Sequence, residues 1–148
     1  MVSFLRAAVM AAWGAICAAF AYFFGGWSDG LICLIICMAI DYTTGLLVAG
    51  VFGASPKSPG GGIESKAAIK GLVRKVFVLT LVGVAHILDG LLATTYVQDA
   101  VVIAFCTSEI LSIVENAGLM GVPLPAALVK AIDLLKAKAE KEADHDGS

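Results

Sequence analysis

Residues 31–52, LICLIICMAIDYTTGLLVAGVF, decide the fold class of this chain. Asp41 is the only charged residue in this run, which is long enough to cross a bilayer, because a spanning helix needs about 20 mostly apolar residues. Three further mostly apolar runs occur at about residues 5–24, 72–93 and 100–118, and the last is the weakest because Glu109, Ser112, Glu115 and Asn116 interrupt it. We therefore expect an all-α integral membrane protein with about four transmembrane helices, three being the alternative number.

The composition of the whole chain supports a membrane location. Apolar residues make up 59% and charged residues 15% of the 148 residues, whereas soluble domains average about 45–50% and about 25%. The mean hydropathy is +0.93. A soluble fold of this length buries only about two-thirds of its surface, so it could not hide so many apolar side chains.

The basic residues indicate the orientation. They are Arg6 near the N-terminus, a central group and a group near the C-terminus. Lys and Arg residues collect in the short loops on the cytoplasmic side of a membrane. The central group, a cytoplasmic basic loop, consists of Lys57, Lys66, Lys70, Arg74 and Lys75. We expect loop 53–71 and both termini to lie in the cytoplasm, with the chain crossing the membrane several times. This placement explains the basic group without a nucleic-acid partner.

Two features concern the ends of the chain. Arg6 followed by an apolar run and Ala19-Phe20-Ala21 resembles a cleavable signal peptide, which stays an alternative to a first span. After residues 121–125 (GVPLP), apolar side chains recur at helical spacing through Leu128, Ile132, Leu135 and Ala139. We predict a transmembrane domain over residues 1–124 and a cytoplasmic amphipathic helix with a polar tail over residues 125–148.

The most informative side chains are the acids within the predicted spans. Asp41 and Glu109 lie near the centres of their spans, where a charged residue costs about 2.5–3.5 kcal/mol on insertion scales. We expect no Lys or Arg at matching depth, so the acids must be protonated, hydrogen-bonded or exposed to water. Two interpretations stay open, namely a hydrogen bond that holds helices together and a lining for a water-filled lumen.

Helical spacing groups these acids with other side chains into faces. The candidates for a pore-lining or polar face are Asp41, Thr44, His86, Asp89, Glu109, Ser112, Glu115 and Asn116. Small residues that let helices approach closely recur every four positions. They are Ala7, Ala11, Ala15 and Ala19 in the first span and Gly45, Ala49 and Gly53 in the second.

We predict no catalytic, cofactor or metal site. His86 and His145 are far apart in sequence, and neither lies in a recognisable pattern with a Ser or Cys nucleophile. Cys33 and Cys37 share a helix face, but no second pair or histidine completes a zinc-type spacing. We interpret the cysteines as small apolar packing residues.

A set of motifs occurs in order along the chain: residues 41–45 (DYTTG), 70–75 (KGLVRK), 85–89 (AHILD) and 109–116 (EILSIVEN), followed by residues 121–125 (GVPLP). Together they resemble the bacteriophage holins of the toxin secretion/phage lysis type over about residues 41–135. The Pro/Gly-rich loop 55–62 departs from that pattern. The resemblance implies a small protein of the host inner membrane that oligomerises and forms lesions, which release a cell-wall-degrading endolysin or a toxin.

The resemblance also implies the partners. They are further copies of the chain, the lipid bilayer and, as a candidate, an antiholin, while endolysin passes through without requiring direct binding. Our hypothesis is that the Asp41, Asp89 and Glu109 faces turn to a water-filled opening on assembly. Two alternatives stay open, namely a small four-span proton-coupled transporter and a non-conducting membrane scaffold. Transporters of that class are expected to carry an acid in the first span, where this chain has none.

Overall fold

The computed structural model describes residues 1–58, 60 and 62–134, and these residues form α-helices and no strand. The four long helices are α1 (Val2–Phe24), α2 (Asp29–Gly50), α3 (Ser65–Leu92) and α4 (Val97–Leu119). Each is long and apolar enough to cross a membrane. The all-α fold class and the number of four candidate spans are therefore confirmed.

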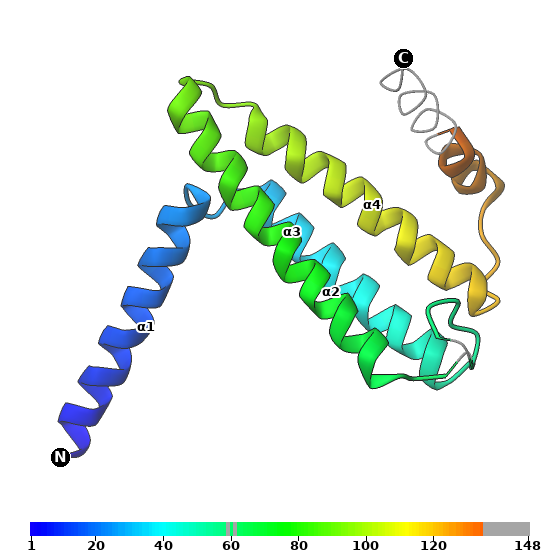
Figure 1. The fold of residues 1–148 in the computed structure, drawn as a ribbon, viewed down its shortest axis with the longest axis horizontal. Helices are drawn as coiled ribbons and strands as arrows, with labels where there is room; N and C mark the ends of the chain where they lie inside the picture. The colour runs from blue at the N-terminus through cyan, green and yellow to red at the C-terminus, as the bar shows by residue number, and fades with distance from the viewer. Residues whose placement is uncertain (59, 61, 135–148) are drawn as a thin grey trace.

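Helices α2, α3 and α4 form a three-helix bundle, from which α1 diverges (Figure 1). The most extensive packing joins α2 to α4, and α3 packs on both of them. Helix α3 runs opposite to its two neighbours, so the linker of residues 51–64 and the turn of residues 93–96 lie at opposite ends of the bundle (Figure 1).

The apolar core occupies the half of the bundle that adjoins the α1–α2 turn. Its buried members are Phe24, Leu31, Leu34, Met38, Val78, Val82 and Val102, drawn from all four helices. Many large apolar side chains on the outside of the bundle stay exposed, among them Ile36, Phe77 and Ile103. An outer surface of this kind suits lipid, which is as apolar as the side chains that face it.

Helix α1 is attached to the bundle through its C-terminal end alone. Phe23 packs against Gly83 of α3 so closely that a Cβ at residue 83 would lie 1.9 Å from the Phe23 ring. Gly25 ends α1 in the left-handed conformation with a φ of 72°. Residues 1–19 are exposed, so the predicted small-residue face of Ala7, Ala11, Ala15 and Ala19 has no partner within the described chain.

Two predicted boundaries are wrong. Helix α3 begins at Ser65, within the predicted loop 53–71. Charged side chains disfavour immersion in lipid, but they do not prevent a helix, because Lys, Arg and Ala form helices readily. Helix α2 ends at Gly50, so Gly53 is a turn residue with a φ of 59° and does not belong to a helix-packing face. Gly45 and Ala49 are half-buried within α2, and Gly45 lies close to Asn116 of α4.

The predicted amphipathic helix at the C-terminus is described in part. Residues 126–134 are helical and follow a short segment without regular secondary structure after α4. The remainder of that prediction, with Leu135, Ala139 and the polar tail of residues 144–148, lies outside the described residues.

Candidate functional site

Three charged side chains meet between α2, α3 and α4, one from each helix. The Nζ atom of Lys75 donates a hydrogen bond to Oδ2 of Asp41 at 2.8 Å and a second hydrogen bond to the carboxylate of Glu109. The three side chains are only 10–13% exposed. We call Asp41, Lys75 and Glu109 the charge cluster. One ammonium group thus connects all three helices of the bundle.

The expectation that no Lys or Arg lies at the depth of the acids is wrong. Lys75 is ten residues from the start of α3, and Glu109 is ten residues from the end of α4. Asp41 is nine residues from the end of α2. At 1.5 Å per residue, all three therefore lie about 14–15 Å from the linker end of the bundle. Charge alone groups Lys75 with the cytoplasmic basic residues, although it lies within the predicted span 72–93.

An amide and a hydroxyl extend the charge cluster toward the linker. Nδ2 of Asn116 donates hydrogen bonds to Oδ1 of Asp41 at 3.2 Å and to Oγ1 of Thr44 at 2.9 Å. The Thr44 hydroxyl in turn donates to the backbone carbonyl of Asp41 at 3.1 Å. Both carboxylate oxygens of Asp41 therefore accept from a donor. The polar faces predicted on α2 and α4 do face each other.

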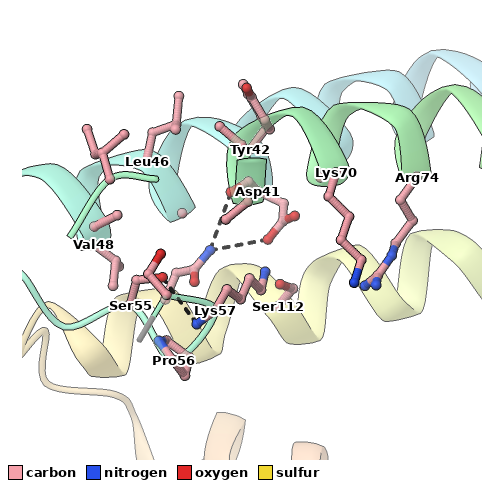
Figure 2. Close-up of a pocket in the computed structure, with 18 of the residues that line it drawn as sticks. Asp41, Tyr42, Leu46, Val48, Ser55, Pro56, Lys57, Lys70, Arg74 and Ser112 are labelled. Carbon is pink, nitrogen blue, oxygen red and sulfur yellow. Dashed lines mark hydrogen bonds between the residues drawn. The ribbon is translucent and has the colours of Figure 1, made fainter. Parts of the chain in front are cut away.

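A cavity of about 400 Å³ opens beside the charge cluster and is lined by α2, α3, α4 and the linker (Figure 2). Ser112 of the predicted α4 face lines it together with Asp41, Glu109 and Asn116. The linker folds over this end of the bundle. This placement buries Ser58 and brings the Ile63 side chain against Gly50. Residues 55–58 therefore form part of the cavity wall and do not act as a free tether.

Asp89 and His86 lie far from the charge cluster. Asp89 is fourteen residues beyond Lys75 along α3, which corresponds to about 21 Å. Its carboxylate accepts hydrogen bonds from the Thr94 hydroxyl at 2.6 Å and from the backbone N–H groups of Val97 and Gln98 at 3.0 and 2.8 Å. These are orphan donors of the first turn of α4, so Asp89 acts as the cap of that helix.

The two remaining candidates are also outside the cavity. The His86 ring lies against Gly25 at the α1–α2 turn, where a Cβ would come within 2.2 Å of it. Glu115 is exposed and does not line the cavity. The structure thus brings together Asp41, Thr44, Glu109, Ser112 and Asn116 and adds Lys75, whereas His86, Asp89 and Glu115 are elsewhere.

The chemistry of the charge cluster is ionic and structural. One ammonium and two carboxylates leave a net charge of −1, and each group would be costly to bury alone. Separation of α2, α3 and α4 would break both ion pairs, at a cost that is offset only if water reaches the charges. No group of three or more His, Cys, Asp or Glu residues in the described part of the chain is arranged to hold a metal ion.

Comparison of the sequence with known proteins places the chain in a family. The sequence matches the bacteriophage holin family over residues 18–137, which include the whole charge cluster and cavity. It is 36% identical to the uncharacterized protein BH0965 of Halalkalibacterium halodurans, covering 84% of this chain and 90% of that protein. It is likewise 36% identical to the uncharacterized protein Lmo0128 of Listeria monocytogenes, covering 87% and 88% of the two chains.

A third relative extends the match along almost the full chain. The uncharacterized protein YtkC of Bacillus subtilis is 28% identical over 95% of this chain and 93% of its own length. No solved structure matches. The family match covers α2, α3, α4 and the end of α1, and the four apolar helices agree with a membrane protein. The chain therefore belongs to the bacteriophage holin family.

Proposed function

We propose that this chain assembles in the inner membrane of a bacterium and permeabilises it, releasing an endolysin or a toxin from the cytoplasm. The observation that carries the proposal is the charge cluster, which lies between the helices of the family-matched region. A bundle that serves only as an anchor gains nothing from three ionisable groups at a helix interface, because well-packed apolar residues are as stable there or more stable.

The charge cluster suggests a closed and an open state. In the closed state Lys75 pairs with both carboxylates and the bundle is intact. In the open state α2, α3 and α4 separate, and water solvates Asp41, Lys75 and Glu109. The cost of breaking the ion pairs is then offset by hydration, so these helices can line an aqueous lesion.

Helix α1 supplies a surface for assembly that does not require the bundle to open. Its residues 1–19 are exposed and include the repeated alanines at positions 7, 11, 15 and 19. A small-residue face lets the backbones of two helices approach closely in lipid. We propose that copies of the chain associate through this face before α2, α3 and α4 separate.

We further propose that both termini and the linker lie in the cytoplasm. The linker and the first turns of α3 carry Lys57, Lys66, Lys70, Arg74 and Lys75, whereas the turn of residues 93–96 carries no basic residue. Residues 76–92 of α3 are apolar apart from Thr80, His86 and Asp89, and span about 26 Å. A hydrocarbon layer of about 30 Å therefore ends close to Lys75.

Inducible expression in a bacterium tests the proposal. The readouts are growth, a membrane-potential dye and cell lysis, with and without a cytoplasmic endolysin. We expect depolarisation in both strains and rapid lysis only with endolysin. Proton-dependent drug efflux without depolarisation would instead favour a transporter. Normal growth and potential at high membrane abundance would leave the scaffold interpretation.

A pair of double variants tests the role of α1. Ala11→Leu with Ala15→Leu adds bulk on the small-residue face, and we expect fewer cross-linked oligomers and delayed or abolished depolarisation. Val9→Leu with Trp13→Leu changes the opposite face and serves as the matched control, with normal oligomers and timing. Equal behaviour of the two variants, at equal abundance, would show that the alanine face does not mediate assembly.

A further inference from the structure

We propose that the cavity at the linker end of the bundle is a binding site for an anionic phosphate group, carried either by a lipid headgroup or by a free phosphate. This site is separate from the proposed lytic function, because it requires only the closed bundle. The proposal rests on the charges that line the cavity, on the end of α3 that faces it and on its size.

Three cationic side chains of the cavity wall lie outside the charge cluster. Lys70 and Arg74 lie one helical turn apart on α3, and both side chains extend from α3 toward α4 (Figure 2). Lys57 reaches the same cavity from the linker. These three side chains are exposed and form no salt bridge with any residue that the structure describes. Like charges one turn apart on a helix repel each other, so an anion between them would relieve the repulsion.

The carboxylates of the cavity do not cancel this charge. Asp41 and Glu109 are both paired with Lys75, so the charge cluster contributes a net charge of only −1 to the cavity. Among the described residues that line the cavity, Glu64 is the only other acid. Four cations thus face three carboxylates, and the surplus positive charge lies on the Lys57, Lys70 and Arg74 side of the cavity.

The N-terminus of α3 is the second source of positive potential. Ala67 and Ala68 of its first turn line the cavity, and no side chain caps this helix. A helix of this length carries a partial positive charge at its N-terminus. The Ala68 N–H already donates to the backbone carbonyl of Glu64 at 3.0 Å, which leaves the N–H groups of residues 65–67 as those that can bind an anion. Arg and Lys side chains beside such N–H groups are the usual donors to phosphate oxygens.

The cavity is large enough for such a ligand and open to it. About 400 Å³ falls within the range of small-molecule sites, and it would hold a phosphate group with the glycerol that follows it in a lipid. The cavity lies where the apolar part of α3 begins, at the depth of lipid headgroups. A headgroup phosphate could reach it from the membrane and a free phosphate from the aqueous side.

Thermal unfolding of the full chain in neutral detergent tests the site. The probes are inorganic phosphate and phosphatidylglycerol, each titrated at constant ionic strength so that general screening does not change. We expect a saturable rise in Tm with at least one probe. Saturation with phosphatidylglycerol alone identifies a lipid headgroup as the source of the anion, and saturation with inorganic phosphate identifies a free phosphate.

Variants connect the rise in Tm to the cavity. In Lys70→Gln/Arg74→Gln we expect the apparent affinity to fall about tenfold or more, because two charge-assisted hydrogen bonds are lost. The control, Lys66→Gln/Lys130→Gln, removes the same charge from exposed positions outside the cavity and should bind as the wild type does. Lys57→Gln, which changes no helical residue, should also weaken binding. This single variant tests the cavity if the double variant fails to fold.

Two results would overturn the proposal. The first is the absence of a saturable rise in Tm with either probe in the wild-type chain. The second is an equal loss of affinity in the Lys66→Gln/Lys130→Gln control, which would mean that the anion responds to net charge and not to this cavity.

Discussion

Replacement of Lys75 by Gln removes the ammonium group that connects α2, α3 and α4. The Asp41 and Glu109 carboxylates then stay at the helix interface without a counter-ion, although both are about nine-tenths buried. Loss of one partner from a buried ion pair costs about 3–5 kcal/mol, because the remaining charge is left uncompensated. Lys75 serves two carboxylates, so we expect a value at the upper end of this range, against a total stability of about 5–15 kcal/mol for a typical domain.

Reversible unfolding in mixed micelles, followed by the loss of helical circular dichroism, measures this effect. The control Lys66→Gln lies on the same helix, is exposed and forms no ion pair with the described residues, so its effect should stay within about 0.5 kcal/mol. A Lys75→Gln variant as stable as this control would refute the conclusion that the charge cluster holds the bundle together.

A triple variant separates charge from packing. Asp41→Asn alone is unsuitable, because both oxygens of Asp41 accept hydrogen bonds and an amide offers only one oxygen. Asp41→Asn with Lys75→Gln and Glu109→Gln removes every charge of the charge cluster and should recover most of the lost stability. If charges must be hydrated in the open lesion, this variant should fold and oligomerise but permeabilise late or not at all. Lysis at the wild-type time would contradict that requirement.

Three further predictions concern the rest of the chain. Asp89→Ala removes the cap of α4, so we expect a lower Tm in calorimetry, whereas loss of pore activity at unchanged Tm would assign the carboxylate a different role. Gly83→Ala places a Cβ against the Phe23 ring, so the distance between spin labels on α1 and α3 should increase without unfolding of the bundle. An unchanged distance would mean that the Phe23 side chain moves aside while α1 stays in place. The topology can be tested in a background without native cysteines. A cysteine that replaces the exposed Ser65 should resist an impermeant thiol reagent in intact cells, whereas one that replaces the exposed Thr95 should react. The reverse pattern would mean that the orientation is opposite to the proposed one. Ser58 is unsuitable for this test because it is buried.

The sequence alone determined the class of protein and the number of spans. Apolar runs of bilayer length and the scarcity of charge within them are local properties of the chain, since each span must satisfy its own backbone in lipid. Spacing along α2 and α4 likewise grouped Asp41 with Thr44, and Glu109 with Ser112 and Asn116, because residues three and four apart share a helix face. These faces could be predicted without knowledge of the fold.

Only the tertiary structure decided which faces meet and what compensates the acids. Lys75 follows Arg74 at the edge of an apolar run. The neighbouring sequence does not show whether such a lysine side chain extends into the lipid headgroups or pairs with two carboxylates of other helices. That choice depends on where α3 begins and on the antiparallel course of α3 beside α2 and α4. The same applies to Asp89, whose donors belong to the following turn and helix. Spans can be predicted from local hydropathy, whereas the partners of a buried charge depend on how separate helices align in depth.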